Sequence, residues 1–404
     1  MSKTASFVRL LLIAAGMLIS GPLFPAQKFL PNHHEVKYVI LMVPDGMNLS
    51  SVTAARIRLN GITGAPLYME TLERIGYQRT YSQLNTVTDS SAAASTWACG
   101  EKFVNNEVCF HMDGRPNNPS LLELAKARGM STGLVATQTI THATPASFGA
   151  HVSAPSGISP RSCETEIARQ YVTVTQPDVL LGGGRSKFAP TSPDACGVAG
   201  NYIEVAMSLG YAYASTSSEL AMAVATKPKK LLGLFANGQL TPEYIRPPAI
   251  TEPRLPEMTE AALTLLERDR TGFFLMVEGS LIDSGNHAAN LDYLVGEMSA
   301  FDESVKVVLD WIAAKPDREQ HTLLMVLPDH ETGALAIHGT EKPGAEPFGF
   351  FWPAYTWQKP PEPETHHAGG DIVFWVQGPG SEFLARPIDN TFVYHVIRAL
   401  LRYR

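Results

Sequence analysis

Three apolar stretches of this 404-residue chain end in acidic or histidine side chains. They close with VPD at Asp45, with VE at Glu278 and with LPDH at Asp329 and His330. A single Asp after a strand is commonly a helix N-cap, and Asp45 taken alone is open to that interpretation. Three such endings favour a ligand site, because ligands bind at the carboxyl ends of strands in open α/β sheets. We expect these side chains to meet at one edge of a sheet.

Further residues of the metal-ligand type lie near other apolar runs. Asp283 and His287 are four residues apart, so they share one face on a helical turn. His367 lies in the sequence HHAGGD, just before another apolar run. Each of these side chains alone is compatible with a purely structural role. The combined set of carboxylates and imidazoles suffices for two metal ions of the zinc type. Its members are Asp45, Glu278, Asp283, His287, Asp329, His330 and His367.

A segment rich in serine and alanine, VTDSSAAASTW at 87–97, contains a candidate nucleophile. One interpretation is a capped, alanine-rich helix with no further role. The other places the Ser90 hydroxyl at a helix N-terminus, where backbone N–H groups and the helix dipole favour a phosphoryl group. A neighbouring metal ion would lower the pKa of the hydroxyl, so that no histidine base is required. The segment alone leaves both interpretations open.

Strand-like apolar runs alternate with amphipathic helical patterns along the chain. Runs such as YVILMV at 38–43 are continuously apolar, which is typical of strands buried on both faces. The sequence therefore predicts an α/β fold with a large central, mostly parallel sheet and helices on both faces. The predicted strands are 38–43, 132–141, 179–181, 273–277, 322–327 and 372–376. The predicted helices are 120–128, 259–268 and 291–314.

Three connections are rich in proline and glycine, at 149–160, 190–200 and 343–363. They are interpreted as loops of a single domain over residues 33–404, not as linkers between domains. The last connection is rich in aromatic side chains and is either a lid or interface region or an ordinary packed loop. Its aromatic side chains are Phe348, Phe350, Phe351, Trp352, Tyr355 and Trp357.

The N-terminus and the cysteines indicate export. Lys3 and Arg9 precede an apolar run at 10–19 and the tripeptide SGP, which is typical of a secretory signal peptide over residues 1–26. An uncleaved N-terminal anchor is the alternative, although the run is short for a membrane span. We expect a secreted or periplasmic location with no stable membrane span after processing. The four cysteines predict two disulfides; Cys99–Cys109 and Cys163–Cys196 are favoured among three connectivities because each closes a local loop.

From about residue 37 to the C-terminus, the chain resembles the alkaline phosphatase family through seven motifs that occur in family order. They are PDGM at 44–47, TDSSAAAS at 88–95, THATPASFGAHV at 141–152, LLGGGRSKF at 180–188, EGSLIDSGNHAAN at 278–290, PDHETGAL at 328–335 and HHAGGD at 366–371. The resemblance implies the fold of that family and a phosphate monoester hydrolase. It also implies two Zn²⁺ ions and one Mg²⁺ ion as cofactors.

The resemblance also implies a role for each matched residue. Ser90 is implied as the nucleophile that becomes phosphorylated. The ligands implied for one zinc ion are Asp283, His287 and His367. Those implied for the second zinc ion are Asp45, Ser90, Asp329 and His330. Those implied for the magnesium ion are Asp45, Thr144 and Glu278, with Asp45 bridging two metals.

The phosphate-binding arginine is less direct to align. The family places it a few residues after an Ala-His-Val segment, which here occupies 150–152, but Pro155 stands where it is expected. Arg161 fits if residues around 154–160 are an insertion. We take Arg161 as the phosphate clamp, since its planar fork can bind two phosphoryl oxygens. A surface arginine in a loop is the alternative.

Two positions that vary within the family bear on the site. His142 occupies a position that is Asp in some members and His in others. An imidazole there favours zinc or cobalt over magnesium at the third metal site. Ser284 follows Asp283 where some members carry Lys or His near the phosphate, so one positive contact is missing.

The implied mechanism consists of two displacements through a phosphoserine, with two metals about 4 Å apart flanking the reacting phosphorus. The expected substrates are small-molecule phosphate monoesters, and the family commonly forms homodimers. The net charge of −7 argues against nucleic-acid binding. A phosphodiesterase of the same superfamily is the alternative function. A sulfatase is disfavoured by the serine motif, and a catalytically silent metal- or phosphate-storing protein is disfavoured by the complete ligand set.

Overall fold

The computed structural model describes residues 36–339, 348–354 and 364–402. The signal peptide predicted at 1–26 lies outside these residues, as do Tyr355 and Trp357 of the aromatic connection. Within the described ranges, no helix is both long and apolar enough to cross a membrane.

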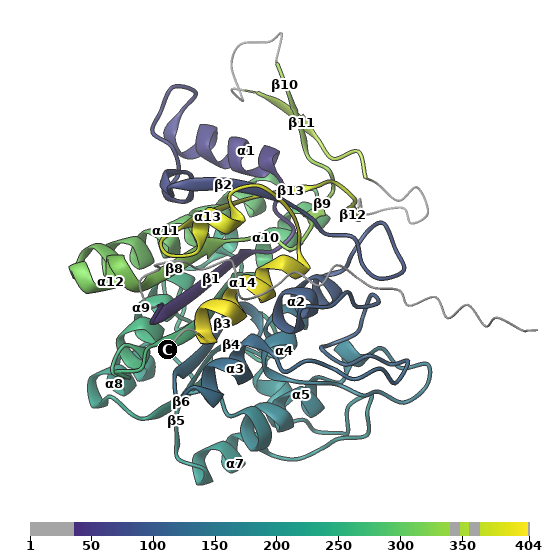
Figure 1. The fold of residues 1–404 in the computed structure, drawn as a ribbon, viewed down its shortest axis with the longest axis vertical. Coiled ribbons are helices and arrows are strands. Elements are labelled where there is room, and N and C mark those ends of the chain that lie inside the picture. Colours follow the sequence, from purple (N-terminus) through teal and green to yellow (C-terminus); the bar gives the residue numbers. More distant parts are fainter. Residues whose placement is uncertain (1–35, 340–347, 355–363, 403–404) are drawn as a thin grey trace, which may run out of the picture. The chain divides into compact units, whose positions relative to one another are not determined.

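Ten of the described strands form one sheet in the order β14-β2-β13-β8-β1-β7-β3-β4-β6-β5. From β8 to β5 in this order all neighbours are parallel, whereas β13 is antiparallel to both of its neighbours. The predicted large, mostly parallel sheet is confirmed (Figure 1). The strands are β1 Tyr38–Pro44, β2 Arg74–Arg79, β3 Ser131–Thr139, β4 Val179–Gly183, β5 Tyr211–Ala214, β6 Lys230–Leu234, β7 Phe273–Gly279, β8 Thr322–Val326, β13 Ile372–Gln377 and β14 Pro387–Asp389.

Helices cover both faces of this sheet. Phe273 of β7 belongs to a core that also contains Met258 of α9 and Leu294 of α11. The next residue, Phe274, packs against Phe148 of α4, with ring centroids 5.7 Å apart. Since successive strand side chains point to opposite faces, α9 and α11 lie on one face and α4 on the other. The helices that bear on the core and the site are α1 Leu49–Asn60, α2 Ser90–Cys99, α4 Ala143–Gly149, α9 Leu255–Leu266, α10 Leu281–His287 and α11 Leu291–Ala313.

Four strands of the ten-stranded sheet were not predicted from the sequence, namely β2, β5, β6 and β14. Each of them is short, and β2 has the mixed sequence RIGYQR, with Ile75 59% and Tyr77 42% exposed. β2 therefore lacks the continuous apolar run that marks a strand buried on both faces, and β5 and β14 have only four and three residues. Helix α9 also begins four residues earlier than predicted, at Leu255, with a proline in its first turn, where proline is well tolerated.

Both predicted disulfides are present, Cys99–Cys109 and Cys163–Cys196. In the described part of the aromatic connection, β11 (Gly349–Phe351) pairs antiparallel with β10 (Ala336–His338), which precedes the connection. Trp352, which follows β11, is buried, whereas Phe351 is half exposed. Trp352 therefore packs into the fold, as the packed-loop interpretation predicts for that residue.

Candidate active site

Three neighbouring strands bring the predicted acidic residues to one edge of the sheet. β1 lies between β7 and β8, and its register pairs Val43 with Glu278. Asp45 follows β1 directly, and Asp329 follows β8 after two residues. Because these strands are parallel, their carboxyl ends meet at the same edge. All three carboxylates are buried there, with at most 1% of each residue exposed.

The first ligand group consists of Asp45, Asp329 and His330. Their ligand atoms lie within 4.8 Å of one another. Nε2 of His330 is 3.2 Å from Oδ2 of Asp329 and 3.6 Å from Oδ1 of Asp45. Oδ1 of Asp329 accepts hydrogen bonds from the backbone N–H groups of Gly46 and His330, at 3.0 and 2.9 Å. These bonds orient the carboxylate of Asp329 so that its Oδ2 faces the imidazole of His330.

The second group consists of Asp283, His287 and His367. Oδ2 of Asp283 is 3.3 Å from Nε2 of His287, and Oδ1 is 3.8 Å from Nε2 of His367. Both imidazoles place Nδ1 at a backbone carbonyl, His287 at Thr365 and His367 at Thr88. With Nδ1 directed at a carbonyl, each imidazole can bind a metal ion through Nε2. Against the effect of burial, the hydrogen bond and charge of Asp283 raise the pKa of His287 to about 9, so its Nε2 must lose a proton when a cation binds.

The two groups adjoin. The rings of His330 and His367 stack with centroids 3.6 Å apart, and Asp283, His330 and His367 also place ligand atoms within 4.8 Å of one another. Thr332 donates a short hydrogen bond to Asp283. The structure thus gathers both predicted zinc-ligand sets into one cluster, in which the first group is buried and the second is partly exposed.

A third group lies at Thr144 and Glu278, beside Asp45. Among the described residues, several of its buried side-chain oxygens have no hydrogen-bond partner. These atoms are Asp45 Oδ1, Thr144 Oγ1, both carboxylate oxygens of Glu278 and Asp329 Oδ2. Buried polar atoms without partners cost about 1–3 kcal/mol each, so such a concentration calls for bound cations. The donor set of hydroxyl, carboxylates and imidazoles fits zinc and magnesium.

The electrostatics of the cluster point the same way. Burial raises the pKa of Glu278 to about 7, and burial with the repulsion of Asp283 raises that of Asp329 to about 6. Burial and then the charge of Asp329 raise the pKa of Asp45 well above its usual value. Burial also opposes the charge of Asp283, but the hydrogen bond and charge of His287 hold its pKa low. Cations would offset the repulsion among these carboxylates.

Ser90 is the first residue of α2 and reaches this cluster. Asp89 is the N-cap of the helix, and its Oδ1 accepts from the backbone N–H of Ala92 at 2.9 Å. Oγ of Ser90 lies 3.1 Å from Nε2 of His330. The Ser90 side chain is therefore held between a helix N-terminus and the first ligand group. That is the position in which a phosphoryl group would meet both backbone N–H groups and metal ions.

Arg161 lies in a short 3-10 turn at Pro160–Ser162 and contacts Asp89. Its Nη1 donates to Oδ2 of Asp89 at 2.8 Å, and Nη2 is 3.2 Å from Nε2 of His142. Burial and then the charge of Arg161 lower the pKa of His142 to about 4, so this imidazole is neutral at ordinary pH. The residues of the apparent insertion thus bring Arg161 next to the serine helix.

A pocket of about 460 Å³ opens beside the cluster. Its lining includes residues 85–89, Asn105, His287, His366 and His367. His287 and His367 belong to the second ligand group and Asp89 is the N-cap of the serine helix, so this pocket borders both. It provides room for the alcohol portion of an ester whose phosphoryl group lies at Ser90.

Three positioning residues were not found from the sequence. Asn286 is fully buried between Asp283 and His287; its amide donates to the carbonyl of Gly46 at 3.2 Å and accepts from Nε1 of Trp352 at 2.9 Å. Thr332 donates to Asp283, and the carbonyl of Thr365 lies at Nδ1 of His287. Asn286 and Thr332 lie inside the EGSLIDSGNHAAN and PDHETGAL motifs, which was the available signal. Nothing in the sequence pairs Trp352 with Asn286.

Comparisons with known proteins show which family this chain belongs to. A family model described as alkaline phosphatase matches residues 36–349. Alkaline phosphatase 3 of Bacillus subtilis is 36% identical over 337 residues, covering 80% of this chain and 68% of that protein. Streptomycin-6-phosphate phosphatase of Streptomyces griseus is 33% identical over 415 residues, covering 91% of this chain and 90% of that protein.

Solved structures show the same likeness. The alkaline phosphatase from the Antarctic bacterium TAB5 matches with a TM-score of 0.77 and 26% identity, covering 92% of this chain and 100% of that chain. A variant of that enzyme with one histidine replaced by glutamate, which matches equally well, has Mg bound in its M3 site.

Proposed function

Because this chain belongs to the alkaline phosphatase family, a family of metal-dependent phosphomonoesterases, we propose that it hydrolyses phosphate monoesters through a phosphorylated Ser90. The observation that carries the proposal is the position of Oγ of Ser90, 3.1 Å from His330 at the N-terminus of α2. The hydroxyl thereby faces both a ligand group and the backbone N–H groups that favour a phosphoryl group.

The reaction is written as two in-line displacements. In the first, Oγ of Ser90 loses its proton and bonds to phosphorus, while the bond from phosphorus to the alcohol oxygen breaks and the alcohol takes up a proton. In the second, water bonds to phosphorus and the bond to Oγ breaks, which releases inorganic phosphate and restores Ser90. Arg161, oriented by Asp89, binds two non-bridging oxygens and stabilises the charge on them.

We assign two Zn²⁺ ions and one Mg²⁺ ion to the three ligand groups. Asp283, His287 and His367 would hold one zinc ion, and Asp45, Asp329 and His330 with Ser90 the other. Bound there, zinc supplies Lewis acidity that favours the ionised serine, the departing alcohol oxygen and an ionised water. The unpartnered oxygens of Asp45 and Glu278 support this assignment.

His142 directly precedes α4 and lies two residues before Thr144, which belongs to the third site with Asp45 and Glu278. His142 is neutral at ordinary pH, as its low pKa requires, so its Nδ1, which is buried and has no partner among the described residues, is available to a cation. We propose that this imidazole, compared with a carboxylate at the same position, weakens the preference of the third site for magnesium over zinc or cobalt. In support of this proposal, the TAB5 variant that has glutamate in place of one histidine holds Mg in its M3 site.

The proposal is tested by comparing three nitrophenyl esters. The rate constant kcat/KM for the phosphate monoester should exceed that for the bis-nitrophenyl diester and for the sulfate by about 10²-fold or more, because a diester lacks one of the charged oxygens that the site binds. The Ser90→Ala variant, prepared in parallel, controls for contaminating hydrolases. Comparable or faster diester turnover would assign the chain to the phosphodiesterase alternative.

We further propose an extracytoplasmic homodimer, acting on small-molecule esters. Export is supported by the two disulfides, which persist in oxidising compartments, and by the signal-like N-terminus, with an uncleaved anchor as its alternative. Ile75 and Tyr77 alternate on β2 and are exposed on one face of it, as an interface requires. Sedimentation of the wild type should give the mass of a dimer, and Ile75→Glu should shift it toward the monomer.

A further inference from the structure

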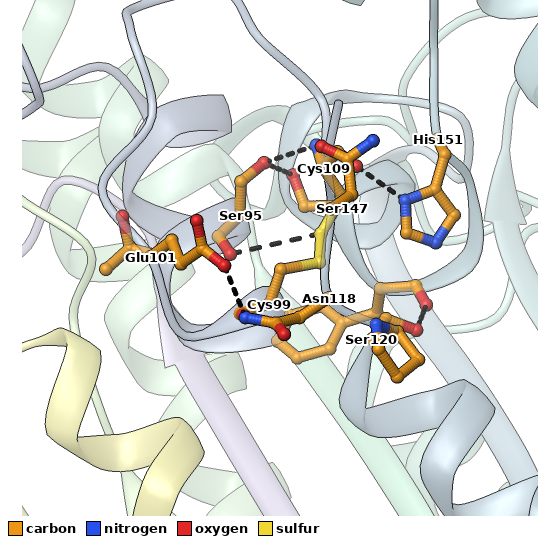
Figure 2. Close-up of a disulfide and its surroundings, with 12 residues drawn as sticks. Ser95, Cys99, Glu101, Cys109, Asn118, Ser120, Ser147 and His151 are labelled. Atoms are coloured by element: carbon orange, nitrogen blue, oxygen red, sulfur yellow. Dashed lines mark hydrogen bonds between the residues drawn. A yellow bond between two sulfur atoms is a disulfide. The ribbon is translucent and has the colours of Figure 1, made fainter. Parts of the chain in front are cut away.

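The disulfide Cys99–Cys109 closes a loop that begins at the end of the serine helix. Cys99 is the last residue of α2, and Gly100 follows as its left-handed C-cap. Figure 2 shows the disulfide beside Ser95, whose Oγ accepts from the backbone N–H of Cys109 at 2.8 Å and lies 3.0 Å from Oγ of Ser147. The loop is thus attached to α2 at the end of the helix that is farthest from Ser90.

The same loop returns to the other end of the helix and holds Asp89 from two sides. The backbone N–H of Asp89 donates to Oδ1 of Asn105 at 3.3 Å, and the amide of Asn105 donates to the carbonyl of Val87 at 3.1 Å. The backbone N–H of Asn106 donates to Oδ2 of Asp89 at 3.0 Å. Asn106 has φ +76°, a left-handed conformation that ordinary residues seldom adopt, and it sets the direction of that N–H.

Oδ2 of Asp89 is also the atom that accepts from Nη1 of Arg161. Asn106 reaches the arginine turn a second time, because its side-chain oxygen accepts from Oγ of Ser159 at 3.2 Å. On the other side of Arg161, Cys163 anchors the turn to Cys196. The carboxylate and the guanidinium are therefore each tied to a disulfide-closed segment.

We propose that the loop closed by Cys99–Cys109 positions the phosphate clamp, with Asn105 and Asn106 as the positioning residues that act through Asp89 on Arg161. The inference rests on the proposed function of Arg161 as a phosphate ligand. A long arginine side chain loses rotamer freedom when it binds a ligand. Fixing Asp89 removes part of that loss before the phosphate arrives.

The proposal is tested by a double-mutant cycle between the loop and Arg161, with inhibition by inorganic phosphate as the readout. Asn105→Leu should raise the phosphate inhibition constant about tenfold in the wild-type background. In the Arg161→Ala background the same change should alter it less than about twofold, because no guanidinium remains to position. Equal effects in the two backgrounds, or no effect in the wild type, overturn the proposal.

A matched control and a second variant complete the cycle. Asn117→Leu removes a similar loop amide, which accepts from the backbone of His111 at 2.9 Å and makes no contact with Asp89 in the described structure; it should leave phosphate inhibition unchanged. The pair Cys99→Ala and Cys109→Ala should reproduce the effect of Asn105→Leu, again only when Arg161 is present. A wild-type chain that neither hydrolyses esters nor binds phosphate would refute the proposed function, whereas an active chain with an additive cycle refutes only this inference.

Discussion

Oγ of Ser90 lies 3.1 Å from Nε2 of His330, although 240 residues separate the two in the sequence. The contact joins the N-terminus of α2 to the loop after β8, and so joins a candidate nucleophile to a metal-ligand group. Burial and the neighbouring His367 keep the pKa of His330 well below its usual value. The imidazole is therefore neutral, as a metal ligand must be.

Arg161 should contribute mainly to phosphate affinity. Arg161→Ala removes charge-assisted hydrogen bonds worth about 1.5–3 kcal/mol, so the phosphate inhibition constant should rise about 10- to 100-fold. Arg161→Lys should recover only part of this loss, since an ammonium lacks the planar fork. Arg169→Ala, which removes a half-exposed arginine paired with Glu166, serves as the control. Unchanged inhibition in Arg161→Ala would assign the clamp to another residue.

His142 should decide the metal at the third site. His142→Asp replaces a neutral imidazole with a carboxylate, a hard oxygen ligand that suits magnesium. After equilibration with equal concentrations of magnesium and zinc, metal analysis should find more magnesium per chain in this variant than in the wild type. His338→Asp changes an exposed histidine and should leave the metal ratio as it is. The same ratio in all three proteins would remove His142 from the third site.

Trp352 should support zinc binding from outside the ligand set. Its Nε1 donates to Asn286, which lies between Asp283 and His287. Loss of such supporting hydrogen bonds commonly costs 10- to 100-fold in metal affinity. Trp352→Phe should therefore lower zinc affinity about tenfold in competition with a chelator. Trp311→Phe removes a similar indole hydrogen bond, to Glu267 at 3.1 Å, and should leave zinc affinity unchanged; an equal loss in both variants would contradict a specific role.

Glu297 should make the protein less stable as the pH rises. Burial, with a smaller contribution from the repulsion of Glu243, raises the pKa of Glu297 to about 8, against an unfolded value near 4.5. Between these two values the folded state binds more protons than the unfolded state, so stability falls from about pH 4.5 to pH 8. Glu297→Gln should remove this contribution. The free energy of unfolding of the variant, relative to that of the wild type, should therefore be about 1–3 kcal/mol higher at pH 8.5 than at pH 5.

The measurement for Glu297 is the free energy of unfolding from denaturant titration at both pH values. Asp310→Asn, which alters an exposed carboxylate farther along α11, is the control and should show no such pH-dependent gain. A Glu297→Gln variant whose stability relative to the wild type is the same at both pH values would contradict the prediction.

Much of this site could be predicted because its ligands follow strands that are buried on both faces. The runs that became β1, β7 and β8 are continuously apolar, and the residues after them, Asp45, Glu278 and Asp329, meet at one edge of the sheet. The strands near one edge of the sheet were harder to predict. β2 exposes Ile75 and Tyr77, and its short mixed sequence carries neither a continuous apolar run nor turn signals.

Contacts between distant segments could not be predicted, since neither partner carries a local signal. The aromatic connection was recognised, but its hydrogen bond from Trp352 to Asn286 spans 66 residues. The contact between Asn105 and Asp89 likewise could not be predicted, because the conformation of the loop that carries Asn105 depends on a disulfide. For Arg161 the sequence offered only an alignment across an apparent insertion; the contact with Asp89 is what brings it beside Ser90.

The most direct test of the account is to trap the phosphorylated enzyme with a phosphate monoester at mildly acidic pH and to locate the phosphoryl group by peptide mass spectrometry. The account predicts one phosphoryl group on Ser90, its loss in Ser90→Ala, and a fall in kcat of about 10³-fold or more in that variant. Ser91, whose hydroxyl donates to the carboxylate of Asp89 at 3.0 Å, should carry none. A phosphoryl group on Ser91, or one that persists in Ser90→Ala, would contradict the central claim.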